Sequence, residues 1–333
     1  MNRGRFLLFF CSLCQMALAQ TAETPAIKAI SRLVTVDVAV TDERTGLRVE
    51  DLRQSDFKVF DNGRSQQIVF FSGKDSLQPI YLLLLIDMRS TTKTEIPYIK
   101  EALAPALQKL RPQDEVSVMD FGTGAEMVLP FTTDRQEVLD AIATIEQRQR
   151  DRLAKRSHRD REHERVYRGQ GEDIAACLQA GIQHTHERRP NGRPVFLLFS
   201  DDLNAPPRHV VMDTTKILLK ESATVNGLIK VSSKLAAVFK PISGLSRFDQ
   251  GHNIEYYSQQ TGGEAMNIQE HSYGAALEKV VGDIVGRYSL AFVPSNTDRR
   301  FHKLAVKVSP SSPDSSGNLR VRARRGYWLK DAD

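Results

Sequence analysis

Two aspartates stand where apolar stretches of the sequence stop. Asp87 ends the run "IYLLLLID", and Asp201 directly follows the run "RPVFLLFS". Both runs have the length and composition of strands that are buried on both faces of a parallel sheet. Because open α/β sheets bind ligands where their strands end, the two carboxylates are expected to converge on one edge. Carboxylates in such a place suit cation binding or acid-base chemistry.

Other patterns of reactive residues are thin. The chain has no His-Glu-x-x-His, Gly-x-Ser-x-Gly or Walker sequence, and "GTG" at 122–124 has the composition of a turn. The histidines of "HTHERR" at 184–189, together with His158 and His163, have no accompanying thiols and no zinc spacing, which favours solvated side chains. The sequence therefore predicts a protein-interaction module and no enzyme.

The segments around the two aspartates alternate between strand and helix patterns. Apolar residues at helical spacing follow Asp87, and a helix begins at Asp134 with the capping pattern Asp-x-x-Glu. Further strands are predicted at 114–121, 125–131, 224–231 and 262–268, and further helices at about 210–221, 254–260 and 272–285. Residues 78–285 are therefore expected to form one α/β domain with a doubly wound, mostly parallel sheet.

Both flanks of this region have β patterns. Residues 33–42 alternate strictly, and the sequence predicts two strands joined at Asp61-Asn62-Gly63, where Asn and Gly tolerate positive φ. The stretches "GRYSLAFVP", "HKLAVKVSP" and "GNLRVRARRGYWL" predict three more strands near the C-terminus. Residues 20–77 and 286–330 are expected to pair with each other in a small β-sandwich domain.

This order of elements resembles the von Willebrand factor A domain. The resemblance implies a metal-ion-dependent adhesion site, which uses Asp-x-Ser-x-Ser after the first strand, a Thr on a later loop and an Asp after the fourth strand. The stretches "VTVDVAVTDERTGLRVEDLRQSDFKVFDNGRSQQIVFF", "YYSQQTGGEA" and "RYSLAFVPSNTDRRFHKLAVKV" are similar to exported, acidobacterial-type VWFA-related proteins over nearly the whole mature chain. The resemblance points to a family and implies no general activity.

The residues "DMRST" depart from that site pattern. Asp87, Thr91 and Asp201 match ligands, but Arg89 stands at the first serine and Glu172 at the later threonine. Hard divalent cations require oxygen ligands, and a guanidinium has none. We therefore expect a degenerate site without a physiological metal, in which the three carboxylates hold Arg89 in place of the ion. In the alternative, Arg89 faces solvent, Glu172 becomes a ligand, and the site binds Mg²⁺ or Mn²⁺.

The first residues, "MNRGRFLLFFCSLCQMALAQ", have the pattern of a secretory signal peptide. Arginines precede an apolar core, and Ala17-x-Ala19 stands before Gln20. The core is shorter than the roughly 20 apolar residues of a membrane span. Removal of residues 1–19 would leave Cys177 as the one cysteine, which is expected to be a buried helical residue. The expected location is secreted or periplasmic.

Residues 147–170 form a basic segment with nine Lys/Arg and four Asp/Glu. Such a segment suits an anionic surface or polymer, but a solvated helix or loop has the same composition. The formal charge of the chain, +5, is too small to imply nucleic acid. The expected partner is an extracytoplasmic protein or an anionic envelope component, with no nucleic acid and no permanent membrane span after signal cleavage. An envelope hydrolase and an anionic-polymer-binding protein remain the other functions open to this sequence.

Overall fold

A six-stranded sheet forms the centre of the larger part of the molecule, with the strand order β10-β9-β8-β5-β6-β7. Its strands are β5 (Ile80–Asp87), β6 (Glu115–Phe121), β7 (Ala125–Thr132), β8 (Arg193–Ser200), β9 (Thr224–Lys230) and β10 (Ala265–Ile268). All neighbouring strands are parallel except β6 and β7, which are antiparallel. The computed structural model describes residues 33–73, 78–88, 93–122, 124–154, 173–188, 192–202, 206–231, 253–296, 298–310 and 318–329.

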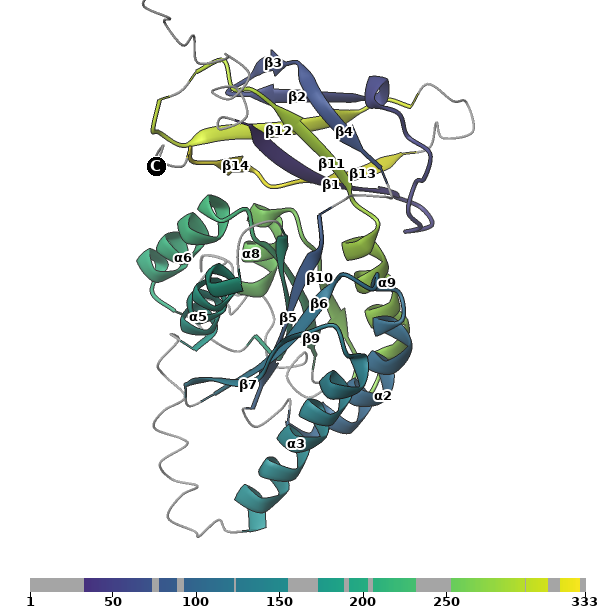
Figure 1. Ribbon diagram of the computed structural model, residues 1–333, viewed down its shortest axis with the longest axis vertical. Coiled ribbons are helices and arrows are strands. Elements are labelled where there is room, and N and C mark those ends of the chain that lie inside the picture. Colours follow the sequence, from purple (N-terminus) through teal and green to yellow (C-terminus); the bar gives the residue numbers. More distant parts are fainter. Residues whose placement is uncertain are drawn as a thin grey trace, which may run out of the picture.

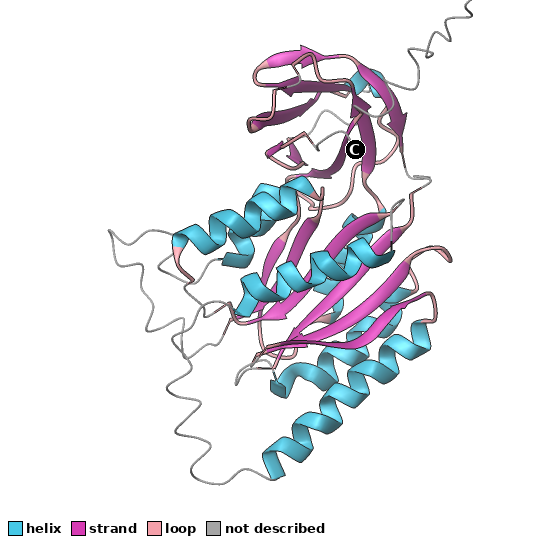
Figure 2. Ribbon diagram, turned by 60° about the vertical axis from the view of Figure 1, so that its left-hand side comes forward, coloured by secondary structure: helices cyan, strands magenta, loops and turns pink. Residues whose placement is uncertain are grey.

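Helices cover both faces of this sheet (Figures 1 and 2). They are α2 (Ile96–Leu107), α3 (Arg135–Ala154), α5 (Asp173–Arg188), α6 (Arg208–Lys220), α8 (Asn253–Thr261) and α9 (Gly274–Val285), with a short 3₁₀ turn η2 (Lys93–Glu95) before α2. Alternate residues of β5 belong to two separate cores: Leu82 and Leu84 pack with α2, α3 and α9, whereas Leu83 and Leu85 pack with α5, α6 and α8. This two-sided burial is why β5 is a continuous apolar run. Cys177 is buried on α5, as predicted.

The two ends of the chain form a β-sandwich against this part. Its strands are β1 (Val34–Asp42), β2 (Phe57–Asp61), β3 (Arg64–Gln66), β4 (Ile68–Ser72), β11 (Tyr288–Phe292), β12 (His302–Val308), β13 (Leu319–Arg322) and β14 (Gly326–Tyr327), with a 3₁₀ turn η1 (Gln54–Asp56). One sheet has the order β13-β1-β11-β4 and the other β14-β12-β2-β3. N-terminal β1 thus lies between two C-terminal strands, and β2 pairs with β12. The predicted fold class is confirmed, whereas the residue boundaries of the domains stay predictions.

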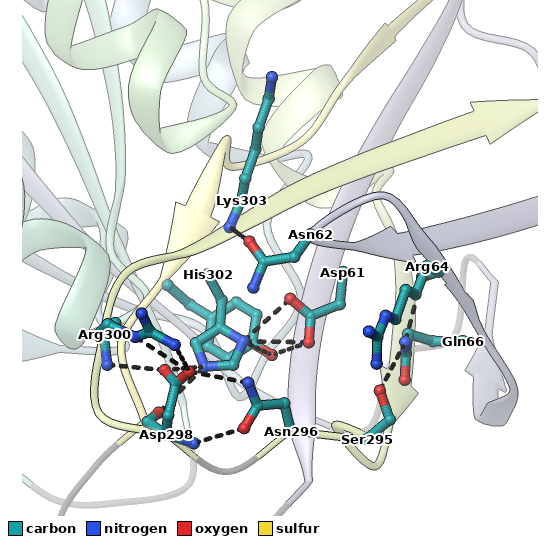
Figure 3. Close-up of polar contacts among 11 residues, drawn as sticks. Asp61, Asn62, Arg64, Gln66, Ser295, Asn296, Asp298, Arg300, His302 and Lys303 are labelled. Carbon is teal, nitrogen blue, oxygen red and sulfur yellow. Dashed lines mark hydrogen bonds and ion pairs between the residues drawn. The ribbon is translucent and has the colours of Figure 1, made fainter.

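A buried polar cluster ties the chain ends together inside the sandwich (Figure 3). His302 is fully buried, and its Nδ1 lies 3.0 Å from Oδ1 of Asp61, while its Nε2 lies 3.1 Å from the carbonyl oxygen of Asp298. The hydroxyl of Tyr327 donates to Oδ2 of Asp61 at 3.0 Å. Because these groups are enclosed, they link β2, β12 and β14 structurally and do not face an external substrate.

The predicted signal peptide and most of the basic segment lie outside the described residues. Among the helices of the described ranges, none is both long and apolar enough to cross a membrane.

Candidate functional site

The carboxyl ends of the parallel strands face away from the sandwich (Figure 1). β5 begins at Ile80, close to the sandwich, and ends at Asp87 on the far side. β8 pairs with β5 in parallel and ends at Ser200, so the two strand ends lie side by side, as the sequence predicts. Asp87 is fully buried, whereas Asp201 is partly exposed.

A chain of hydrogen bonds connects these strand ends to α8. The hydroxyl of Ser200 donates to Oδ2 of Asp87 at 2.6 Å and accepts a hydrogen bond from the backbone N–H of Asp202 at 3.0 Å. Oδ2 of Asp202 then accepts the backbone N–H of Ile254, in the first turn of α8, at 3.0 Å. A carboxylate at this place satisfies one of the free N–H groups of the helix and complements its dipole. The chain therefore fixes β5, β8 and α8 relative to one another.

The backbone of Asp202 has an uncommon conformation. Its φ is +49°, in the left-handed region that favours glycine, and the residue is only 2% exposed. A side-chain-bearing residue in this region costs about 1 kcal/mol or more. The hydrogen bonds of its N–H and its carboxylate offset that cost, and its side chain is a buried carboxyl group at the edge of the sheet.

Ser200 and Asp202 were missed by the sequence analysis. The sequence pattern predicted a role for Asp201, whereas the hydrogen bonds described above involve its two neighbours, Ser200 and Asp202. The available signal was the second aspartate in "SDD", which follows the apolar strand directly. Arg89, Thr91 and Glu172 lie outside the described residues, so their roles, and the direct role of Asp201, stay predictions.

A second charged cluster lies at the same edge, where β9 and β10 end. Glu95 is fully buried, and Nζ of Lys230, the last residue of β9, lies 2.9 Å from its Oε1. The backbone N–H of His271 donates to Oε2 of Glu95 at 2.8 Å. Burial by itself raises the pKa of Glu95, but the hydrogen bonds from Lys230 and His271 prevail and leave it below its ordinary value. The imidazole of His271 also stacks on Tyr98, with ring centroids 3.9 Å apart.

The described residues of this edge do not fit a divalent ion by themselves. The carboxylates of Asp87 and Asp201 are the oxygen donors that such ions prefer. However, no three His, Cys, Asp or Glu side chains within the described ranges are grouped so that they could hold a metal. Oδ2 of Asp87 is already occupied by the Ser200 hydroxyl, and Glu95 is paired with Lys230.

The histidines of α5 are more constrained than their sequence predicts. The ring of His184 stacks on Phe131, with centroids 4.8 Å apart, and its Nε2 lies 3.4 Å from the hydroxyl of Ser117. His186 is half-exposed and lies 3.2 Å from a carboxylate oxygen of Glu221. The expectation that both are simply solvated is therefore wrong for His184, because the β6–β7 hairpin packs against its ring.

Comparison with known proteins gives a family match that spans this edge. Residues 86–203 match the von Willebrand factor type A domain, so the match begins just before Asp87 and ends just after Asp202. Among curated protein sequences, none matches the chain. Similar solved structures include BatB of Bacteroides thetaiotaomicron, with 12% identity over 62% of this chain and 97% of its own and a TM-score of 0.42.

Two other structures are similar at the same level. A von Willebrand factor type A protein of Catenulispora acidiphila has 9% identity over 85% of this chain and 76% of its own, with a TM-score of 0.43. The manganese-loaded TRAP protein of Plasmodium vivax has 11% identity over 81% of this chain and 98% of its own, with a TM-score of 0.38. Likenesses at this level carry no argument about function. The match to the von Willebrand factor type A domain covers about a third of the chain, and it includes the strand ends that form the edge.

Proposed function

We propose that the protein is a protein-interaction module that presents the carboxyl edge of its α/β sheet to a partner. The observation that carries the proposal is the hydrogen-bonded chain from Asp87 through Ser200 and Asp202 to α8. It rigidly frames the end of β8 and leaves the adjoining Asp201 partly exposed. Rigid elements that present a charged side chain are a suitable base for recognition.

Exposed aromatic groups lie at the same edge. Tyr98 is 39% exposed, and the side chain of His271, which stacks on it, is 47% exposed. Tyrosine is enriched among the residues that contribute most to protein–protein binding, because it buries a large apolar area and offers a hydroxyl. We name Tyr98, Asp201 and His271 the rim; it supplies an apolar contact and a carboxyl group at the same edge of the sheet.

The proposal includes no divalent ion and no catalysis. Arg89 stands where the family pattern has a serine ligand. The carboxylate of Asp87 already accepts a hydrogen bond from Ser200, and that of Glu95 is paired with Lys230. Ser200, although next to a carboxylate, is only 1% exposed, so its hydroxyl is not presented to a substrate. The identity of the partner, extracytoplasmic protein or anionic envelope component, belongs to the same proposal.

The test is capture of a partner by purified protein from an extract that contains envelope proteins of the source organism. We expect a captured protein to be lost with Tyr98→Ala and with Asp201→Asn. Phe301→Ala is the matched control, because Phe301 is 43% exposed but lies on the sandwich. Capture should be unchanged in the presence of a chelator.

Two results would contradict the proposal in different ways. Capture that survives both rim substitutions but fails with Phe301→Ala would move the binding surface to the sandwich. Capture that the chelator abolishes and Mg²⁺ or Mn²⁺ restores would establish the ion-dependent alternative, with Glu172 as a ligand.

A further inference from the structure

A polar cavity of about 130 Å³ lies between the sandwich and the α/β part. Its walls include Thr35 and Asp37 of β1 and Arg324 from the segment after β13, all from the sandwich. The α/β part contributes Arg193, where β8 begins, and Thr224, where β9 begins. The cavity is thus at the amino edge of the parallel sheet, opposite to the proposed interaction surface.

The two arginines that line the cavity are buried and incompletely paired. Arg193 is 5% exposed and Arg324 is 9% exposed. Arg193 donates through Nη2 to the carbonyl oxygen of Ile284 at 3.1 Å. Arg324 donates through Nη1 to the hydroxyl of Ser222 at 2.8 Å and to the carbonyl oxygen of Leu219 at 3.3 Å, and through Nη2 to the carbonyl oxygen of Thr35. The Nε groups of both arginines are buried and have no hydrogen-bond partner. Each guanidinium group therefore has one N–H that no described residue satisfies.

A third buried arginine adds to this positive charge. Arg287 is 2% exposed and donates through Nη2 to the carbonyl oxygen of Gly262 at 2.8 Å, while its Nη1 has no partner. Burial lowers the pKa of Arg287 and of Arg324 to about 10, so both remain charged at neutral pH. We name Arg193, Arg287, Arg324 and Asp37 the arginine cluster.

Asp37 is the carboxylate that these guanidinium groups share. Its Oδ2 lies 3.5 Å from Nη1 of Arg193, and its charge also acts on Arg287 and Arg324. The other nearby acids are engaged elsewhere: Asp283 pairs with Arg322 at 2.6 Å, and Glu221, which also lines the cavity, lies 3.2 Å from His186. Two arginines and two carboxylates, Asp37 and Glu221, line the cavity, and Arg287 adds a third buried positive charge outside the lining.

A buried charge is costly unless an opposite charge and hydrogen bonds compensate it. Guanidinium groups match oxyanions well, because their N–H groups form charge-assisted hydrogen bonds with two oxygens at once. A cavity of roughly 150 Å³ accepts a molecule as large as benzene, so this one has room for a tetrahedral oxyanion. We propose that the cavity binds a small oxyanion of the phosphate class, with Arg193 and Arg324 as its main donors and hydroxyls of Thr35 and Thr224 beside it.

Such a ligand contacts both parts of the molecule and therefore stabilises their junction. A ligand that binds only the folded state raises the free energy of unfolding by mass action. Calorimetric titration of the full chain with inorganic phosphate, at constant ionic strength, should show one site per chain. The melting temperature should rise with phosphate concentration and should not rise with sodium chloride at matched ionic strength.

Three variants make the test specific. Arg324→Met should weaken phosphate binding about tenfold or more, since it removes a charge-assisted donor. Asp37→Asn should strengthen binding, because it removes the carboxylate that competes for the same guanidinium groups while an amide oxygen still accepts from Ser289. Arg148→Met should leave the affinity for phosphate unchanged, because the side chain of Arg148, on α3, is exposed.

The Asp37→Asn protein keeps the proposal testable if Arg324→Met does not fold. The proposal is overturned if phosphate gives no binding heat and no chloride-independent stabilisation in the unmodified protein and in Asp37→Asn. It is equally overturned if Arg148→Met weakens binding as much as Arg324→Met does, since the effect would then be general charge attraction.

Discussion

At the scale of single residues, the carboxyl edge depends on carboxylates that have definite donors. Glu95 is the clearest case, because it is fully buried and faces Lys230 at 2.9 Å and the N–H of His271 at 2.8 Å. These donors leave its pKa below the ordinary value of 4.5, in spite of burial. A lowered folded-state pKa means that the ionised group stabilises the protein above the unfolded-state pKa. That stabilisation is lost as the pH falls through the folded-state value.

Glu95→Gln should therefore destabilise the protein in a pH-dependent way. The substitution removes the buried carboxylate that faces Lys230, while the exposed Glu270 lies 3.6 Å from its Nζ. We expect the free energy of unfolding at pH 7 to fall by about 3 kcal/mol, as for other broken buried pairs. As the pH falls through the lowered folded-state pKa, Glu95 of the unmodified protein also becomes protonated, and the difference should shrink.

Urea unfolding at a series of pH values measures this difference. Glu278→Gln is the matched control, because Glu278 forms an exposed pair with Lys109 and should contribute less than about 1 kcal/mol. A difference for Glu95→Gln that is the same at every pH would contradict the role of the charge and leave only a packing effect.

At the scale of elements, close packing of α8 on β9 positions the end of the hydrogen-bonded chain. Gly227 lies in β9, and a Cβ there would be 2.2 Å from Cγ2 of Ile254 on α8. The N–H of the same Ile254 donates to Asp202. The absence of a side chain at position 227 therefore lets the helix approach the strand closely enough to complete the edge.

Gly227→Ala should lower the free energy of unfolding by about 2 kcal/mol, since overpacking of a filled core typically costs 1 to 3 kcal/mol. Gly282→Ala is its control: a Cβ at Gly282, in α9, meets no atom within 4 Å, and alanine is the better helix former. Chemical denaturation should show the first variant destabilised and the second unchanged or more stable. Equal losses of stability in the two variants would mean that the close contact between β9 and α8 does not determine the effect of Gly227→Ala.

At the scale of the whole molecule, ion pairs join the sandwich to the α/β part. Arg322, in β13, donates through Nη2 to Asp283 of α9 at 2.6 Å. Its Nη1 lies 2.8 Å from Oε2 of Glu264, within ion-pair distance although not aligned as a hydrogen bond. Burial raises the pKa of Asp283, whereas that of Glu264 is lowered: burial opposes ionisation, but Arg322 and the neighbouring Lys279 and Arg320 favour it.

Arg322→Met should destabilise the junction by about 3 kcal/mol or more, because it leaves two buried carboxylates side by side. Calorimetry should show a lower melting temperature, and adding Asp283→Asn should restore part of the loss. Arg320→Met serves as a control, since Arg320 contacts the same Glu264 but its side chain is 53% exposed. This substitution should lower the free energy of unfolding by less than about 1 kcal/mol. Equal losses for the two arginines would contradict the importance of burial.

The sequence by itself determined the local features of this protein. The apolar runs of β5 and β8, with acidic residues where they end, predicted the buried parallel strands and the edge they share. The turn at Asn62-Gly63 was equally readable, and both residues have positive φ in the structure. These features follow from residue spacing and from turn geometry, which act between near neighbours in the chain.

Only the tertiary structure determined which strands and charged residues pair when they are far apart in the sequence. The second strand of the predicted hairpin in fact divides into β3 and β4, which join different sheets, because β4 pairs with β11 from the other end of the chain. Likewise, Asp37, Arg193, Arg287 and Arg324 come from four separate parts of the sequence. Each looks like an ordinary polar residue in its own segment. Only the packing of the sandwich on the amino edge of the sheet excludes water from them and makes their charges act on one another.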